Sequence, residues 1–277
     1  STTMNMLTGY LSSTAGSIKV GGVDVLDDPL NAKRLIGYLP EQPPLYPDMT
    51  VEEYLNFAYD LKGCKLDRAK HLGEICDVVK IGDVQKRLIK NLSKGYKQRV
   101  GIAQALVGNP PVIIFDEPTI GLDPKQIIEI RNLIRVLGRD HTVILSTHIL
   151  PEVQAVCDRI IIINNGKLIA DSSAQELTSK FGSTRNLIVR IGTGDENSAF
   201  KMLSKIPGAE KVETLGCKET GSFDFGVITD EGVDLRNEIA KRVIERGWQL
   251  LTVRSQEATL EEIFIGLINQ GAKGGEK

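Results

Sequence analysis

The chain has 277 residues, of which 41% are hydrophobic, so it is long enough to bury the core of one large domain and a smaller one. Its 34 basic and 36 acidic side chains leave a formal charge of −2, which gives no general attraction to nucleic acid, and we expect no nucleic-acid partner. The four cysteines lack Cys-x-x-Cys or Cys/His ligand spacing, which argues against a zinc site or a disulfide framework and favours the cytosol.

The first part of the chain predicts a helix, a hairpin and a short strand. From Ser1 the apolar spacing predicts a helix that reaches Leu11. Alternating apolar residues around a Gly-Gly pair predict a β-hairpin over 18–25. A buried strand is expected over 36–39, and the prolines that follow end it, which leaves Gln42 in a loop.

A helical segment comes next. Thr50 and Glu53 have the spacing of a capping box at the start of a helix. Apolar residues then recur at helical spacing over 67–79, and a further helix is expected to end near Leu106. These helices predict an inserted helical subdomain over about 49–107.

The middle of the chain predicts a parallel sheet. Two apolar strands, 112–115 and 142–145, are expected to be buried on both faces, and an amphipathic helix between them makes a βαβ unit. An Asn-Gly turn between 160–163 and 167–170 predicts a hairpin. This turn also interrupts the longest apolar run, so no segment approaches the roughly 20 residues that a membrane helix requires.

The order of predicted strands and helices changes after Ser183. Strands are expected over 187–191, near 212, over 223–228 and over 250–253, and helices over 198–206, 235–246 and 260–268. The βαββαβ order that begins this region predicts a ferredoxin-like α+β domain. We therefore expect two domains, a larger one over 1–182 and an accessory α+β one over 183–277.

The strongest local signal is the pair Asp116 and Glu117, which ends the strand 112–115. Open α/β sheets bind ligands at the carboxyl ends of their strands. One carboxylate there can hold Mg²⁺, while its neighbour, turned the other way, polarises an attacking water. Taken alone, the dipeptide fits a solvated turn equally well.

Two further positions suit phosphate chemistry. Ser93 and Gly95 stand at the start of a helix, where free amides and the helix dipole attract phosphate, although an ordinary capped helix is the more frequent meaning of such residues. His148 follows the strand 142–145, where it can contact a transferring phosphate; taken alone, it fits a structural histidine.

These features occur together and in one order, and over residues 1 to about 177 the chain closely resembles the ATPase subunits of ABC transporters. Residues 92–96 resemble the family's signature loop, Asp116 and Glu117 its Walker B end, 121–124 its D-loop, His148 its switch histidine and Gln42 its Q-loop glutamine. The combination is highly specific. Lys94, where the signature often has glycine, resembles drug-exporter-type members.

The resemblance implies an α/β fold of the P-loop NTPase class, with a RecA-like parallel sheet, the ABC helical subdomain and the ferredoxin-like C-terminal domain. It implies ATP and Mg²⁺ as cofactors, with ATP trapped between two cassettes. The implied roles are Asp116 as a Mg²⁺ ligand through water, Glu117 as general base, His148 as γ-phosphate contact, Gln42 as a link between the metal and the membrane subunit, Ser93 and Gly95 as caps on the γ-phosphate of the other cassette, and Asp123 as organiser of the dimer seam.

The same resemblance implies the partners. They are integral membrane permease subunits and a second ATPase subunit, in a homodimer or a heterodimer. The chain would then lie in the cytoplasm, peripheral at the inner face of the membrane through the permease. The segment 43–49, together with the helical insert, is expected to dock on the permease, although a rigid turn without a partner fits residues 43–47 too. Residues 94–96 and the C-terminal segment 259–264 resemble ATPases of drug, lipid or gliding-motility exporters rather than importers.

One motif departs from the family. Its phosphate loop reads Gly-x-x-x-x-Gly-Lys-Ser/Thr, and this sequence begins in the register of the last residue. Ser1 and Thr2 are then the predicted nucleotide-binding residues, and Ser1 is a predicted Mg²⁺ ligand. We expect a chain truncated within this motif to bind ATP weakly or not at all, because glycine amides and a lysine hold the phosphates.

Two other classes stay open. One is a soluble ABC ATPase of translation or DNA repair, but such proteins usually carry two cassettes in one chain or long heptad coiled coils, and this sequence has neither. The other is a degenerate cassette that does not hydrolyse ATP. The missing phosphate loop favours that class, whereas Glu117 and His148 argue against it.

Overall fold

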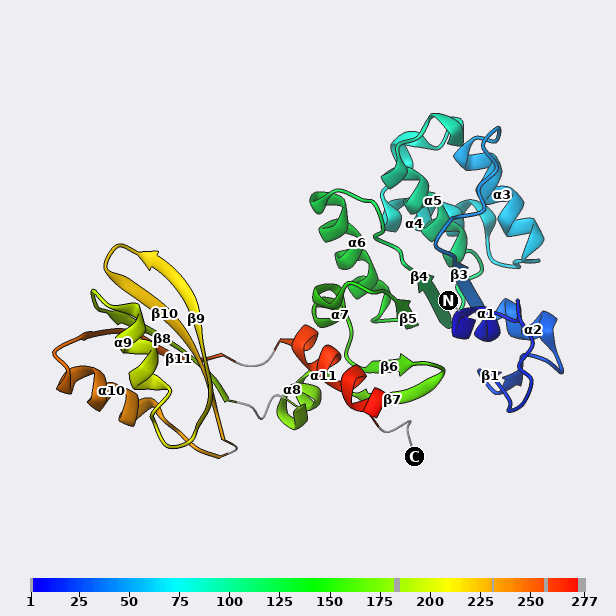
Figure 1. The fold of residues 1–277 in the computed structure, drawn as a ribbon. Helices are drawn as coiled ribbons and strands as arrows, with labels where there is room; N and C mark the ends of the chain where they lie inside the picture. Colours follow the sequence, from blue (N-terminus) through cyan, green and yellow to red (C-terminus); the bar gives the residue numbers. More distant parts are fainter. Residues whose placement is uncertain (1, 182–184, 231, 257–258, 274–277) are drawn as a thin grey trace. The chain divides into compact units, whose positions relative to one another are not determined.

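A computed structural model describes residues 2–181, 185–230, 232–256 and 259–273 (Figure 1). Contacts between residues divide the chain into two compact units, Ser1–Cys157 and Asp158–Lys277. The expected boundary at 182/183, between a catalytic and an accessory domain, is a different division and stays a prediction. Among the described residues, no helix is long and apolar enough to cross a bilayer.

The first unit is built on a parallel sheet in the order β3-β4-β5. Its elements are α1 (Thr2–Leu7), β1 (Lys19–Val20), β2 (Val23–Asp24), α2 (Pro29–Arg34), β3 (Ile36–Leu39), α3 (Val51–Leu61), α4 (Arg68–Val79), the 3₁₀ helices η1 (Gly82–Val84) and η2 (Ile89–Asn91), α5 (Lys94–Leu106), β4 (Val112–Asp116), α6 (Pro124–Leu137), β5 (Thr142–Ser146) and α7 (Leu150–Val156). The predicted βαβ unit is confirmed, because α6 joins β4 to its parallel neighbour β5. The carboxyl ends of the three strands therefore lie at one edge of the sheet.

The central strand of this sheet is the most deeply buried. Ile113, Ile114 and Phe115 of β4 are at most 1% exposed. The expectation that β5 is buried on both faces is wrong for the described structure: Thr142 is exposed and the rest of the strand is half-buried. The reason is that β5 is an edge strand of the described sheet, with β4 on one side only.

Helices α3, α4 and α5 form the predicted helical insert. The capping box at α3 is confirmed, since the Glu53 N–H donates to Thr50 Oγ1 at 3.2 Å and the Thr50 N–H donates to Glu53 Oε2 at 2.7 Å. Buried residues of these helices share one apolar core with β3 and β4. A Cβ at Gly37 of β3 would lie 2.1 Å from the Ala105 carbonyl oxygen of α5, so the strand and the helix backbone meet at a position that needs glycine.

The N-terminal helix is shorter than predicted. α1 ends at Leu7, and Gly9 follows with a φ of 68°, which a helix cannot continue. Tyr10 is 81% exposed and so does not belong to a buried helix face. The hairpin after it is confirmed, because β1 and β2 pair across Gly21 and Gly22, both with positive φ.

The second unit contains the predicted βαββαβ arrangement. Its elements are β6 (Ile160–Asn164), β7 (Lys167–Ser172), α8 (Ala174–Phe181), β8 (Arg185–Gly192), α9 (Glu196–Leu203), β9 (Ala209–Glu219), β10 (Ser222–Thr229), α10 (Arg236–Glu245), β11 (Gln249–Gln256) and α11 (Leu260–Lys273). The antiparallel sheet has the order β11-β8-β10-β9. Its core joins Ile191 and Phe225 of the strands to Met202, Ile239 and Val243 of α9 and α10.

The last helix returns to the start of this unit. α11 contacts α8, β6 and β7, and its residues Leu260, Ile263 and Leu267 are buried. These contacts explain why the predicted hairpin β6–β7, which is confirmed, groups with the second unit.

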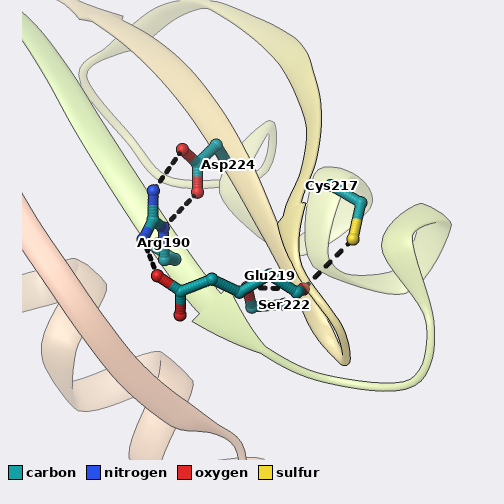
Figure 2. Close-up of polar contacts among 5 residues, drawn as sticks. All are labelled: Arg190, Cys217, Glu219, Ser222 and Asp224. Atoms are coloured by element: carbon teal, nitrogen blue, oxygen red, sulfur yellow. Dashed lines mark hydrogen bonds and ion pairs between the residues drawn. The ribbon is translucent and has the colours of Figure 1, made fainter.

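An ion-pair cluster joins three strands of the second sheet (Figure 2). Arg190 of β8 contacts Asp224 of β10 through Nε and Glu219 of β9 through Nη1, each at 2.6 Å. Asp224 is 4% exposed, so the arginine balances a buried charge. The Ser222 hydroxyl donates to the Glu219 carbonyl oxygen at 3.1 Å, which holds the end of β9 in place.

Candidate functional site

Asp116 and Glu117 lie at the carboxyl edge of the first sheet, where β4 ends. Asp116 pairs with Ser146 at the end of β5, and it is 4% exposed. Its Oδ1 atom is buried and has no hydrogen-bond partner among the residues that the structure describes. A buried carboxylate oxygen without a partner is costly unless a ligand, an ion or water satisfies it.

Glu117 turns sharply away from the strand. Its φ is 50°, a left-handed conformation that few residues other than glycine adopt, and its N–H donates to the Ser146 carbonyl oxygen at 2.9 Å. Its Oε1 accepts the backbone N–H of His148 at 3.1 Å and lies 2.8 Å from His148 Nδ1. Its Oε2 is buried and unpartnered in the described structure. One oxygen is therefore anchored and the other is available to a ligand or water.

The charges of these carboxylates shift the pKa of their neighbours. The hydrogen bond from Glu117, and then its charge, raise the pKa of His148 above its ordinary value. The pKa of the Tyr38 phenol on β3 is also raised, first by burial and then by the charge of Asp116. His148 itself is exposed, whereas the Glu117 side chain is mostly shielded.

The signature residues and the D-loop aspartate come together in a second group. Ser93 caps α5, with its Oγ accepting the Tyr96 N–H at 3.3 Å, and Asp123 caps α6, with its Oδ1 accepting the Gln126 N–H at 2.9 Å. Gly95 is buried against Gln126: a Cβ on Gly95 would lie 2.5 Å from Gln126 Nε2. The start of α5 thus packs directly on the start of α6.

Lys94 lies across the D-loop. A Cβ on Gly121 would fall 2.1 Å from Lys94 Nζ, so the side chain that replaces the usual signature glycine occupies the space over this loop. Gly121 has a φ of 69°. Glycine at this position therefore meets two demands, the left-handed backbone and the approach of Lys94.

Gln42 shares a cavity with Lys94 at the start of α5. It is exposed and lines a cavity of about 430 Å³, and the other lining residues are Glu41, Pro43, Leu45, Pro47, Ile89, Lys90, Lys94, Lys97, Gln98 and Ile120. Among the described residues, no hydrogen bond joins Gln42 or Ser93 to Asp116, Glu117 or His148. Thr2 is exposed at the start of α1, and Ser1 lies outside the described residues.

The sequence did not point to a buried polar group beside this site. The Thr119 hydroxyl donates to Glu152 Oε2 at 2.7 Å, and Arg131 Nη2 donates to Glu152 Oε1 at 3.3 Å. Thr119 and Glu152 are each 1% exposed. Thr119 follows Glu117 by two residues and Glu152 follows His148 by four, which is the one signal that links them to the site.

The residues at the sheet edge suit a nucleotide with Mg²⁺. Asp116 Oδ1 and Glu117 Oε2 are buried oxygens without partners in the described structure. No cluster of three or more His, Cys, Asp or Glu side chains that could hold a metal occurs among the described residues. Mg²⁺ is usually held by one or two carboxylates together with phosphates and water, so Asp116 fits such a site.

Comparison with known proteins gives a consistent result. Residues 1–120 match the family of ABC transporters. The chain is 40% identical over 177 residues to the uncharacterised ABC transporter ATP-binding protein YxlF of Bacillus subtilis, and this match covers 64% of the chain and 58% of YxlF. It is 31% identical to the linearmycin resistance ATP-binding protein LnrL of the same organism, over 96% of the chain and 85% of LnrL.

A solved structure extends the likeness to three dimensions. The ATP-binding cassette MJ0796, solved as a dimer in a post-hydrolysis state with ADP and Pi, matches with a TM-score of 0.56 and 26% identity over 62% of this chain and 79% of that one. This likeness confirms the predicted P-loop NTPase fold class. The chain spans little more than half of the length of YxlF. The chain belongs to the ABC transporter family, as one of its ATP-binding proteins.

Proposed function

We propose that this chain is the ATP-hydrolysing subunit of an ABC exporter and that Glu117 is its general base. The observation that carries the proposal is the contact between Glu117 and His148 at 2.8 Å. It anchors one carboxylate oxygen and leaves Oε2 buried, unpartnered in the described structure and able to take a proton from water.

Each residue at the sheet edge has one task in this scheme. Asp116 would hold Mg²⁺ through water, and bound Mg²⁺ would make the γ-phosphate of ATP more electrophilic. His148 fixes Glu117 through its backbone N–H and its ring, and the exposed ring contacts the γ-phosphate. Ser1 and Thr2 belong to the phosphate and metal site, and Gln42 reports on that site to the membrane subunit.

The two groups of site residues suit a pair of subunits. Ser93 is exposed at the start of α5, and Gly95, two residues further on, is buried against Gln126. No hydrogen bond in the described structure ties either residue to Glu117 or His148. The N-terminus of a helix attracts phosphate. In the proposed dimer, Ser93 and Gly95 of one copy cap the γ-phosphate at Glu117 of the other, and Asp123 lies in the seam. The dimer of MJ0796 with ADP and Pi supports this arrangement.

The cavity beside Gln42 is the proposed docking place for the permease. Three lysines and one glutamate line it together with apolar residues of the segment 43–49. The subunit would then work at the cytoplasmic face of the membrane. The likeness to LnrL, which is named for linearmycin resistance, supports export rather than import.

ATP turnover tests the proposal. The chain is extended ahead of Ser1 with a Gly-x-x-x-x-Gly-Lys segment, and Glu117→Gln is compared with the unaltered form. The amide cannot accept a proton, so kcat should fall by about 100-fold or more while KM changes little.

The matched control is Glu129→Gln, which removes a carboxylate of α6 that pairs with Arg99. Its kcat should stay within about threefold of the unaltered value, because Glu129 pairs with Arg99 and not with Glu117 or His148. If Glu117→Gln turned over ATP as fast as this control, Glu117 would not be the base. If the extended chain bound ATP without any turnover, a degenerate cassette would be the right description.

A further inference from the structure

Two short segments lie next to each other at the sheet edge, and their side chains are in contact at two points. One holds Glu117 and Thr119, and the other holds His148 and Glu152. Glu117 Oε1 lies 2.8 Å from His148 Nδ1, and Thr119 Oγ1 lies 2.7 Å from Glu152 Oε2. These two side-chain contacts are similar in length, and the backbone N–H of His148 adds a third bond, to Glu117 Oε1 at 3.1 Å.

The two contacts differ in burial. The His148 side chain is 69% exposed, whereas Thr119 and Glu152 are 1% exposed. An ion pair with one exposed partner contributes little to stability and is screened by salt. A buried hydrogen bond to a carboxylate is stronger, and losing its donor leaves a desolvated oxygen unpaired. The buried bond between Thr119 and Glu152 is therefore better able to hold the two segments at a fixed distance.

Arg131 balances the charge of the buried Glu152 carboxylate. Its Nη2 donates to Glu152 Oε1 at 3.3 Å, and its Nε is buried without a partner in the described structure. A buried carboxylate with no cation would strongly destabilise the folded chain. Arg131 belongs to α6, which begins after Asp123, so Glu152 joins three segments: the loop after Glu117, the helix after His148 and the D-loop helix.

We propose that Glu152 is a positioning residue, whose buried bonds to Thr119 and Arg131 set the distance between the Glu117 loop and α7, so that Glu117 and His148 meet in one geometry. The inference rests on the proposed role of Glu117. Catalytic groups need to be held to within about half an ångström, and exposed side chains do not hold one another so closely.

The cleanest test is Thr119→Val, which removes the hydroxyl but changes neither charge nor approximate volume. In the chain without nucleotide, NMR titration of His148 reports its distance from Glu117, because Glu117 raises the pKa of this histidine. The pKa should move toward its ordinary value in Thr119→Val and stay unchanged in Thr119→Ser, which keeps the hydroxyl. Glu152→Gln is less clean here, because the charge of Glu152 itself raises the pKa of His148.

Turnover by the extended chain gives the second readout. Thr119→Val and Glu152→Gln should each lower kcat about tenfold or more with KM for ATP within about threefold, because misplacement by an ångström weakens catalysis more than binding. Thr119→Ser should restore most of the rate. If Thr119→Val prevents folding, Thr119→Ala replaces it, because alanine also lacks the hydroxyl.

The control is Asp224→Asn, which removes a buried carboxylate paired with an arginine in the second unit (Figure 2). It should lower the melting temperature but leave the His148 titration and kcat unchanged. If Thr119→Val behaved like this control, Glu152 would be merely structural and the proposal would be overturned. The titration uses no ATP, so it separates this failure from a failure of the proposed hydrolysis, which Glu117→Gln tests.

Discussion

Glu117 is held in a conformation that its side chain does not favour. A φ of 50° costs about 1 to 3 kcal/mol for a residue other than glycine, so neighbouring bonds must maintain it. Its N–H bonds to the Ser146 carbonyl, and its Oε1 accepts the His148 N–H. These bonds stop the strand at Asp116 and aim the two carboxylates differently, which is what separate tasks for metal and water require.

The link between Glu117 and His148 should be visible as a pH effect. Because Glu117 stabilises protonated His148, the pKa of His148 is higher in the folded chain than in the unfolded one. The pair's contribution to stability is therefore complete below a pH of about 6.5 and is lost as the pH rises through the raised folded value. In Glu117→Gln the pKa of His148 should fall toward its ordinary value, as measured by NMR titration.

The chain provides an internal control for this titration. His71 lies in α4, where its Nε2 accepts the Gly108 N–H at 2.9 Å, and its titration should be the same in both proteins. A His148 that titrated identically with glutamate and with glutamine at position 117 would show that the two side chains do not interact in solution.

At this scale the sequence predicted some neighbours and missed others. Glu117 and His148 were placed at one sheet edge because each follows an apolar strand, and parallel strands end together. Glu152 was missed because α7 has only seven residues, too few to show which face is buried, and a glutamate in the first turn of a helix is ordinarily exposed.

Among the elements, β3 and α5 pack closely because glycines lie where they approach each other. Gly37 of β3 meets the Ala105 carbonyl of α5, and Gly101 of α5 meets the side chains of Leu39 and Pro43. The Q-loop segment is thereby held against the signature helix. The cavity at Gln42 is also lined by Lys94, Lys97 and Gln98 of the same helix α5.

Replacing Gly37 with alanine should destabilise the first unit strongly. The new methyl group would lie 2.1 Å from a backbone oxygen and 2.9 Å from Pro110 Cγ, neither of which can move cheaply. Overpacking of this kind costs about 3 kcal/mol, measurable by urea unfolding.

Gly95→Ala is the matched control for this change. Its methyl group would meet only the end of the Gln126 side chain, which can swing away, and alanine favours a helix over glycine. The free energy of unfolding should therefore change by less than about 1 kcal/mol. Equal losses in both variants would show that the contact between β3 and α5 is looser than described.

The long elements could be read from the sequence, and the short ones could not. The helices α3 to α6 and the strands of both sheets have clear apolar periods or caps. The helices α2, α7 and α8 were missed; they have six to eight residues, which show little of an apolar period. Of the eight-residue helices, only α9 was predicted. The predicted extension of α1 to Leu11 failed because Tyr10 and Leu11 fit a helical period by spacing alone, while Gly9 ends the helix.

For the whole molecule, the central question is how the two groups of site residues meet. Glu117 and His148 form one group, and Ser93, Gly95 and Asp123 form the other. Neither composition nor periodicity predicts contacts between copies of a chain, so the shared site came from the resemblance to the family alone. A twofold pair of copies would give each site one group from each subunit.

Mixing two inactive variants of the extended chain tests this claim most directly. Glu117→Gln and Ser93→Arg should each abolish turnover alone. In an equal mixture half of the pairs are mixed, and each mixed pair keeps one intact site, so turnover should return to about a quarter of the unaltered rate. A mixture that stayed as inactive as its components would contradict a site shared between two copies.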